Sequence, residues 1–344
     1  MRRDPDRALR GRRAGGPLGP AQPGDHDGRR ELARGRLQRA GGDSKPGGPR
    51  RRRRERSGGP GDVTKRSSEL TITLEGVDVE FGSGFPGAHL ALRGVDLTLE
   101  VAGCLAVIGP TGAGKTTLLE VAAGLLAPTR GDVRLSMGDS VSDSPLRSSA
   151  GLVYQFPELQ FFEDTVYEDV AFGPRRMGLD ESEVSARVAD ALERSGLSPD
   201  AFEGRDLTTL SAGEKRRAAI AGILALERPF LLLDEPTAGL DPATRECVVD
   251  LLLSESEARG VALVSHDLEL VDRVATRTVV MNEGSIAVDD ETSRVLSDVA
   301  GLEALGLAPP VEYALLSLVR ERAPAEARRV RRALFDARVA DANT

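Results

Sequence analysis

One short glycine-rich stretch has the residue types and the spacing of a phosphate-binding loop. It follows the pattern G-x4-G-K-[ST], and its residues are Gly109, Pro110, Thr111, Gly112, Ala113, Gly114, Lys115, Thr116 and Thr117. Glycines allow backbone N–H groups to curl around phosphate oxygens, and the positive end of a following helix strengthens the attraction. Lys115 can then reach the β- and γ-phosphates, while the Thr116 hydroxyl can bind Mg²⁺.

The surroundings of this loop decide between two interpretations. A glycine-rich turn that carries a lysine by chance is the structural alternative. However, the apolar run CLAVIG (104–109) is typical of a buried strand, and helical spacing follows in TTLLEVAAGLLAP. The phosphate-loop pattern requires a strand before it and a helix after it. We therefore predict a nucleotide site.

Two acids follow another apolar run, in the letters FLLLDE, and are Asp234 and Glu235. Ligands of open α/β sheets bind at the carboxyl ends of the strands, so both acids should face the phosphates. Asp234 suits Mg²⁺, through water, and Glu235 suits polarising the attacking water, because γ-phosphate hydrolysis depends on positioning and charge neutralisation. Two acids that merely cap a strand are the alternative, and the phosphate loop upstream argues against it.

The histidines differ in what their positions predict. His266 ends the buried run VALVSHD, which repeats the strand-end geometry, so we predict that it meets the γ-phosphate. A lone histidine is more often structural than catalytic, and that alternative applies here too. His89, in a stretch that we interpret as a glycine-rich loop, and His26 receive no role.

The letters LSAGEKRR support two interpretations. Ser211 and Glu214 fit a capping box that opens a helix. Small residues at a helix N-terminus, here Ala212 and Gly213, also form an anion site. Both remain open on the residues alone.

The chain pattern that surrounds these motifs predicts an α/β fold. LTITLEGVDVEF and LALRGVDLTLEV alternate as half-buried strands do, whereas CLAVIG, PFLLLDE and GVALVSHD are continuous apolar runs typical of a parallel sheet. These runs alternate with helical stretches. RTVVMNEGSIAVDD predicts a hairpin that turns at 282–284, and 291–344 predicts helices with a break at LAPP.

Charge divides the 344 residues into two regimes. Residues 1–66 contain 20 Lys and Arg against 8 Asp and Glu, which leaves 26 against 46 for the remainder. The basic part has no aromatic residue and is rich in Gly, Pro and Arg, so we expect disorder over 1–67. Its run PRRRRRERS could contact nucleic acid or anionic lipid; a solvated tail, or a translation start placed too far upstream, with Val63 as the true one, is the alternative.

The sequence also argues against three other classes: proteins held together by metal or disulfides, proteins that span a membrane and proteins with a secretory signal. The two cysteines, Cys104 and Cys247, form no metal-binding or disulfide spacing. No apolar run reaches about 18 residues, and no apolar segment follows the first arginines, so we expect neither a membrane span nor a secretory signal.

Five motifs in order resemble the ATP-binding-cassette (ABC) ATPases: GPTGAGKTT, Tyr154-Gln155, LSAGE, LLLDEPTAGLD and VSHD. The resemblance covers about residues 70–290. It implies a P-loop core at 68–290 with an antiparallel β subdomain and a helical subdomain at about 156–212, followed by a mostly helical extension at 291–344. A GTPase would need an N/T-K-x-D motif, which does not follow the strand patterns.

The resemblance also implies roles for residues, with ATP and Mg²⁺ as cofactors. Phe81 would stack on adenine, and Gln155 would link Mg²⁺ and water to a membrane partner. Ser211 and Gly213 would bind the γ-phosphate held by a second protomer, at a seam that contains Asp241. The usual signature is LSGGQ, and Ala212 and Glu214 depart from it. Ala212 is tolerated at negative φ and strained at positive φ.

An aromatic cluster lies at residues 154–174, which hold four of the nine Phe and two of the three Tyr. In ABC ATPases this region leads to a groove for cytoplasmic helices of a polytopic transmembrane subunit, and aromatic residues anchor interfaces. A plain core role for Phe161 and Phe162 is the alternative. We predict a groove with some core behind it.

The wording of this segment, and of LSAGEKRRAAIAGILA and LEALGLAPPVEYALLSLVRE, resembles the ATPases of energy-coupling-factor importers for cobalt, nickel, biotin and other vitamins. The resemblance implies a peripheral protein at the cytoplasmic face of the membrane, paired with a second ATPase through the C-terminal extension. It also implies a separate membrane substrate-binding subunit. Homodimer and pairing with a paralogue both remain open.

Two rival interpretations stand beside this one. The first is the ATPase of an ordinary binding-protein-dependent importer. The second is a soluble ABC protein that acts on nucleic acid or the ribosome, but repair types are interrupted by long coiled coils and translation types carry two cassettes. The sequence has neither feature, so we expect no nucleic-acid partner.

Overall fold

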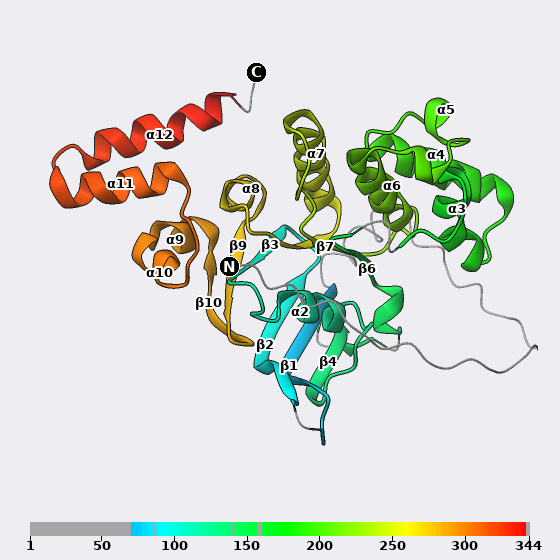
Figure 1. The fold of residues 1–344 in the computed structure, drawn as a ribbon, viewed down its shortest axis with the longest axis horizontal. Coiled ribbons are helices and arrows are strands. Elements are labelled where there is room, and N and C mark those ends of the chain that lie inside the picture. The colour runs from blue at the N-terminus through cyan, green and yellow to red at the C-terminus, as the bar shows by residue number, and fades with distance from the viewer. Residues whose placement is uncertain (1–69, 86, 139, 143, 157–159, 342–344) are drawn as a thin grey trace, which may run out of the picture. The chain divides into compact units, whose positions relative to one another are not determined.

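The computed structural model describes residues 70–85, 87–138, 140–142, 144–156 and 160–341, with side chains up to residue 335 (Figure 1). The prediction for 1–67 lies outside these residues. Two sheets and a set of helices make up the described part, and the larger sheet has helices on one side and the smaller sheet with one helix on the other. The predicted α/β class is confirmed.

The smaller sheet is antiparallel and has the order β2-β1-β4-β5. Its strands are β1 (Leu70–Phe81), β2 (His89–Glu100), β4 (Arg130–Met137) and β5 (Ser140–Val141). Alternate side chains, such as Ile72, Leu74, Leu97 and Leu99, are buried, which explains the period of two in the sequence. At the far end of the β1–β2 pair, Phe81 lies directly opposite His89.

The larger sheet has the order β10-β9-β3-β8-β7-β6 and is parallel except at β10. Its strands are β3 (Cys104–Ile108), β6 (Ala150–Val153), β7 (Phe230–Asp234), β8 (Gly260–Val264), β9 (Arg277–Asn282) and β10 (Ser285–Glu291). Every residue of β3, β6, β7 and β8 is buried. Both faces are covered, which explains the continuous apolar runs. The hairpin predicted at 282–284 is confirmed.

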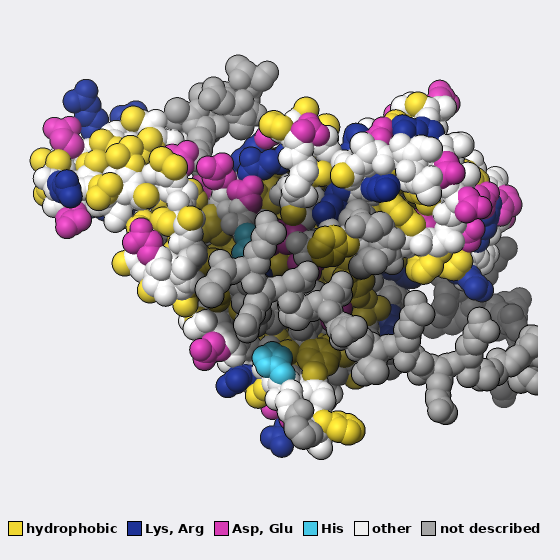
Figure 2. Space-filling view, viewed as in Figure 1, with side chains coloured by type: hydrophobic (Ala, Val, Ile, Leu, Met, Phe, Trp, Pro, Cys, Tyr) yellow, Lys and Arg dark blue, Asp and Glu magenta, His cyan; other side chains and the backbone are white. Residues whose placement is uncertain are grey.

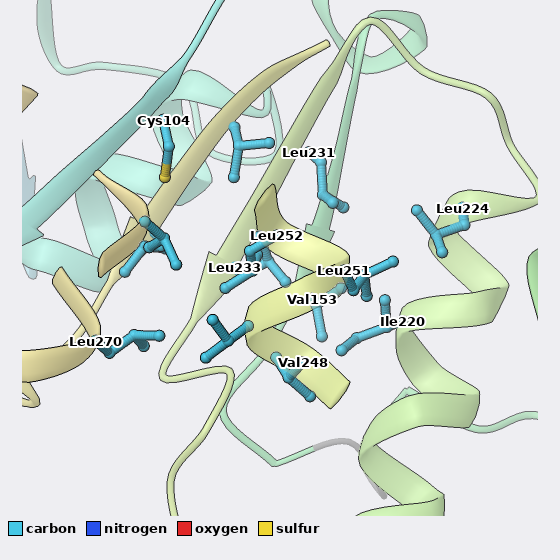
Figure 3. Packing of buried hydrophobic residues seen from close by; sticks show 14 of the residues in the cluster. Cys104, Val153, Ile220, Leu224, Leu231, Leu233, Val248, Leu251, Leu252 and Leu270 are labelled. Atoms are coloured by element: carbon cyan, nitrogen blue, oxygen red, sulfur yellow. The ribbon is translucent and has the colours of Figure 1, made fainter. Parts of the chain in front are cut away.

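Each face of the parallel sheet has its own hydrophobic core. On one face, Cys104, Val153, Leu231 and Leu233 pack against α6 (Ala212–Leu224) through Ile220 and Leu224, and against α7 through Val248, Leu251 and Leu252 (Figure 3). On the other face, Leu105, Val107, Leu232 and Ala262 pack with α2 and the antiparallel sheet. Helices α2 (Lys115–Ala122) and α7 (Pro242–Ala258) lie against the sheet, and α8 (Leu268–Val274) packs on α7.

A helical layer lies beside β6 and β7 (Figure 1). It contains α3 (Val166–Arg176), α4 (Glu181–Arg194), the short α5 (Pro199–Phe202) and α6 (Ala212–Leu224). Two 3-10 turns, η1 (Leu146–Ser148) and η3 (Leu207–Thr209), precede β6 and α6. Because α6 packs on α3 and α4, the layer extends to residue 224, beyond the expected range of about 156–212.

The chain ends in a helical extension, as the sequence predicts. Its helices are α9 (Thr292–Ser297), α10 (Val299–Ala304), α11 (Val311–Arg322) and α12 (Ala327–Asp341). Tyr313 anchors α11, because its buried ring meets Phe335 edge-on at 5.0 Å and its hydroxyl donates to Asp272 on α8 at 2.6 Å. Hydrophobic side chains gather over α11 and α12 (Figure 2). Among the described residues, no helix is long and apolar enough to span a bilayer.

Candidate functional site

A cleft of about 550 Å³ opens where the two sheets meet the phosphate loop. Its lining comprises Phe81, His89, Ala91, Thr111, Gly112, Gly114, Lys115, Thr116, Thr117, Gln155, Asp234, Glu235, Val264 and His266. The structure therefore brings together residues from six separate stretches of the chain. Among the residues described, the sequence-predicted Ser211, Ala212, Gly213 and Asp241 do not line this cleft.

The phosphate loop needs glycine where other backbone approaches it closely. Gly109 has φ 147°, and a Cβ there would lie 2.2 Å from the carbonyl oxygen of Met281. Gly114 has φ 93°, and a Cβ there would lie 2.3 Å from the carbonyl oxygen of Ala91. Gly114 is also the N-cap of α2, so the loop leads directly into a helix N-terminus. This is the strand–loop–helix context that the sequence predicts.

Lys115 is buried beneath this loop. Its Nζ donates to the carbonyl oxygens of Gly109 at 2.8 Å and Pro110 at 2.9 Å. Burial lowers the pKa of Lys115, and the nearby carboxylates of Glu235 and Asp234 act in the opposite direction. The two acids thus favour the charged form of the lysine that faces the phosphate site.

Asp234 ends β7 and is buried against α2. The Thr116 hydroxyl donates to its Oδ2 at 2.6 Å. A hydroxyl, a carboxylate and the amide of Gln155 therefore line one cleft, and all three offer the hard oxygen ligands that Mg²⁺ prefers. The donor set fits a magnesium ion held by few protein groups together with phosphate and water.

Glu235 follows Asp234 in an unusual environment. Its φ is 50°, its side chain is almost fully buried, and its Oε1 has no hydrogen-bond partner among the described residues. Burial raises the pKa of Glu235 to about 7, with the backbone N–H of His266 acting in the opposite direction. Left-handed non-glycine residues are strained and collect at functional sites. A carboxylate with one unpaired oxygen at this position can accept a proton or orient a water molecule.

His266 lies beside Glu235, because the two residues follow the carboxyl ends of the neighbouring strands β8 and β7. Its Nε2 is 3.6 Å from Glu235 Oε1, which is too long for a direct hydrogen bond. Burial lowers the pKa of His266, the charge of Lys115 lowers it further, and Asp234 acts in the opposite direction. The imidazole is thus held beside the carboxylate and can meet a phosphate oxygen or a water molecule between them.

His89 is a residue of the cleft that the sequence analysis missed. The interpretation of its surroundings as a loop is wrong at this position, since His89 begins β2. It pairs with Phe81, which is 45% exposed, and both side chains line the cleft. The alternation of β2 can be followed back from Leu92 to Leu90 in the sequence, but the pairing of His89 with Phe81 appears only in the structure.

The LSAGE stretch lies outside the cleft, at the start of α6. The predicted capping box is confirmed: Ser211 Oγ accepts from the N–H of Glu214 at 3.3 Å, and Glu214 Oε2 accepts from the N–H of Ser211 at 2.7 Å. Glu214 also binds Arg205 at 2.8 Å. Ala212 is the first residue of α6 and is not among the described residues with positive φ, so the departure from glycine causes no backbone strain.

Asp241 lies next to this stretch. It caps α7, with its carboxylate accepting from the Thr244 N–H at 3.1 Å and hydroxyl at 2.6 Å. A Cβ on Gly213 would lie 3.0 Å from the Thr244 side chain. The helix starts that carry Ser211 and Asp241 are therefore neighbours, and together they form a surface apart from the chain's own cleft.

A second hollow, of about 600 Å³, lies over α3 and α6. We call it the aromatic groove, and its lining is mainly apolar: Glu120, Tyr154, Gln160, Phe162, Asp169, Phe172, Gly173, Ala219, Gly222, Ile223 and Leu226. Phe162 stacks on Phe172 with ring centroids 5.6 Å apart and is 75% exposed. Phe161, by contrast, packs against the core. The core alternative therefore holds for Phe161 and is wrong for Phe162.

The polar side chains that line the aromatic groove include two acids, Asp169 and Glu120. Burial raises the pKa of Asp169, although its Oδ1 accepts the backbone N–H groups of Phe162 and Glu163 at 2.8 and 3.3 Å. Burial raises the pKa of Tyr154. The Glu120 carboxylate, which accepts a hydrogen bond from the Tyr154 hydroxyl, raises it further. Glu120 belongs to α2, the helix that begins at Lys115.

Comparison with known proteins agrees with the family resemblance of the sequence motifs. A family described as ABC transporter matches residues 92–238. The energy-coupling factor transporter ATP-binding protein EcfA2 of Symbiobacterium thermophilum is 43% identical over 258 residues, covering 74% of this chain and 89% of the relative. EcfA2 of Clostridium perfringens is 38% identical over 260 residues, covering 73% and 90%.

Solved structures share the fold. cbiO1 from Clostridium perfringens, a part of the ABC transporter complex cbiONQ, matches with a TM-score of 0.58 at 29% identity, over 75% of this chain and 97% of that one. The ATP-binding cassette MJ0796, as a post-hydrolysis dimer with ADP and Pi, matches with a TM-score of 0.56 at 27% identity, over 64% and 98%.

Fold, cleft and comparisons together define an ABC ATPase, a class of enzyme that binds and hydrolyses ATP. The predicted fold, with its P-loop core, is confirmed. Within that class, the chain belongs to the family of energy-coupling factor transporter ATP-binding proteins. The family resemblance of the sequence motifs is thereby confirmed, and the soluble ABC rival is not supported.

Proposed function

We propose that this chain binds ATP with Mg²⁺ and hydrolyses it to drive a membrane importer of the energy-coupling-factor type. The transported substrate would be cobalt, nickel, biotin or another vitamin. One observation carries the proposal: Lys115, Asp234 and Glu235, from two separate motifs, meet in a single cleft with the phosphate loop. Family membership supports the importer class.

Within the cleft, each residue suits one task. The backbone of 109–117 and Lys115 would hold the phosphates. Thr116, Asp234 and Gln155 would hold Mg²⁺, which supplies charge neutralisation at the phosphates. Glu235, with its unpaired Oε1, would orient and polarise the attacking water, and the neighbouring His266 would contact the γ-phosphate. Phe81 would receive the adenine.

The surface at the starts of α6 and α7, which we call the signature surface, supports a dimer. Ser211, Ala212, Gly213 and Asp241 lie apart from the chain's own cleft, at two adjacent helix starts. In the proposal they face the ATP held by a second protomer, where the α6 N-terminus attracts phosphate. Val311, Leu315 and Leu318 on α11 are exposed at helical spacing, which suits pairing of the two extensions. The partner would be a second copy or a paralogue.

The aromatic groove is the proposed contact with a polytopic transmembrane subunit at the cytoplasmic face of the membrane. Exposed Phe162 and Phe172 offer the aromatic anchors of an interface. Tyr154 lines the groove and the next residue, Gln155, lines the nucleotide cleft. One backbone segment therefore borders both the aromatic groove and the nucleotide cleft, which suits coupling. A separate membrane subunit would bind the transported substrate.

The test is a purification of the tagged protein from its own cells in mild detergent, with partners identified by mass spectrometry. We expect a polytopic scaffold and a small integral substrate-binding subunit. Phe172→Asp should lose both while retaining ATP hydrolysis in isolation. Leu253→Asp is the matched control, because Leu253 is a helical residue of similar exposure on α7. Recovery of ribosomes, nucleic acid or no membrane protein with the wild type would refute the proposal.

A further inference from the structure

The inference starts from the pairing of two rings at one end of the nucleotide cleft. Phe81 ends β1, His89 begins β2, and the two are direct partners across the antiparallel pair. Directly opposed residues project from the same face of a sheet with Cβ atoms about 4.5–5.5 Å apart. Both side chains line the cleft. The two rings therefore line one cleft from paired strand positions, and we call this pair the aromatic wall.

His89 has no structural task that would account for its position. Its side chain is exposed, and among the described residues no hydrogen bond or ion pair involves it. The buried faces of β1 and β2 are formed by other residues, such as Val79 and Leu92. Replacement of an exposed side chain of this kind leaves stability nearly unchanged. The side chain of His89 instead lines the nucleotide cleft.

The elements that carry the aromatic wall indicate which part of a bound nucleotide it contacts. The phosphate-binding groups come from the loop and α2, and the acids come from the parallel sheet. Phe81 and His89 come from the antiparallel sheet, which contributes neither the phosphate loop nor the acids. A purine base is flat, apolar on its faces and wider than a single phenyl ring, so two adjacent rings offer it a better stacking surface than one.

We propose that His89 is a second nucleobase-binding residue, which together with Phe81 forms a two-ring platform for the adenine of ATP. The inference rests on the proposed function, because it assigns the base end of that same ATP site. It adds a residue that the phosphate-loop, acid and signature motifs do not include. His89 acts on nucleotide affinity and has no part in the hydrolytic step.

The test compares binding of ATP with binding of inorganic tripolyphosphate, which lacks a base. All proteins carry Glu235→Gln so that ATP is not consumed. His89→Ala should weaken ATP binding about fivefold, as expected for loss of one aromatic stacking contact, and should leave tripolyphosphate binding unchanged. His89→Phe should retain ATP affinity, because it retains the ring. Val141→Ala, at an exposed strand residue of the same sheet, is the control.

Kinetics in proteins with Glu235 intact provide a second readout. His89→Ala should raise KM for ATP about fivefold with kcat unchanged, since only ground-state binding is lost. Unchanged ATP affinity in His89→Ala, alongside weakened binding in Phe81→Ala, would overturn the proposal. So would an equal loss of tripolyphosphate binding. If the Glu235→Gln protein with Phe81 and His89 intact binds neither ATP nor tripolyphosphate, that result would instead refute the proposed ATPase function.

Discussion

Glu235 combines three properties that each destabilise a folded protein. Its backbone is left-handed, its side chain is buried, and one carboxylate oxygen has no hydrogen-bond partner among the described residues. A strained backbone of this kind costs about 1–3 kcal/mol, and an unpaired buried acceptor costs about as much again. Such a combination persists where it serves chemistry, and the neighbouring Lys115 and His266 show which chemistry it faces.

Glu235→Gln should preserve ATP binding and lower turnover by at least about 10²-fold, the usual contribution of a general base. Glutamine has the same size and can keep the hydrogen bond from the His266 backbone, but it cannot accept a proton. Phosphate release and equilibrium ATP binding are the measurements. Glu283→Gln is the control, since Glu283 has a similar φ of 47° and an exposed side chain outside the cleft. Turnover at the wild-type rate would remove Glu235 from its proposed role.

Thr116→Val should raise the Mg²⁺ concentration required for half-maximal hydrolysis by about tenfold, the low end of the range for loss of a metal-site partner. Valine keeps the shape of threonine but lacks the hydroxyl that lies 2.6 Å from Asp234. A Mg²⁺ titration of ATP hydrolysis measures the shift. Thr116→Ser keeps the hydroxyl and should behave as the wild type. An unchanged Mg²⁺ requirement in Thr116→Val would contradict the assignment of this pair to the metal.

At the scale of elements, an ion cluster joins the helical layer to the helices of the parallel sheet. Glu255 on α7 is 3% exposed and binds Arg194 on α4, with Nη2–Oε1 and Nε–Oε1 distances of 2.5 and 3.1 Å. Arg259 binds its other oxygen at 2.8 Å. Two arginines thus converge on one buried carboxylate, and removal of that carboxylate would leave them facing each other.

Glu255→Ala should lower the free energy of unfolding by about 3 kcal/mol, the low end for breaking a buried pair, because Arg194 is partly exposed to solvent. Urea unfolding followed by circular dichroism measures the change. Glu257→Ala, at an exposed position on the same helix, should change stability by no more than about 0.5 kcal/mol. Equal midpoints for the two variants would show that the cluster does not hold the layers together.

At the scale of the whole molecule, the proposed dimer can be tested at one residue. Ser211→Asp keeps a good N-cap for α6 but places a negative charge where the partner's γ-phosphate would lie. In a Glu235→Gln background, ATP with Mg²⁺ should produce dimers of the parent and leave Ser211→Asp monomeric by light scattering. Ser211→Asn is an equally good cap without the charge and should still dimerise. Dimerisation of all three would contradict a seam at Ser211.

How much of the molecule could be predicted from the sequence depends on how local each signal is. The strands β3, β7 and β8 and the phosphate loop could be predicted, because burial on both faces and close backbone approach restrict the residue types directly. The pairing of Phe81 with His89 could not, since it depends on strand register and on bulges within β1 and β2. Phe161 and Phe162 are chemically identical neighbours, and only packing separates them.

The two cores described above share one wall, and this has a consequence for unfolding. Along β7, Leu231 and Leu233 face one core while Phe230 and Leu232 face the other. Loss of either core would expose the apolar underside of the strands that support its neighbour. Neither core should therefore unfold without the other. A substitution that destabilises the core beside the aromatic groove should also destabilise the core beside the nucleotide cleft. Calorimetry should detect a single cooperative transition in place of sequential melting.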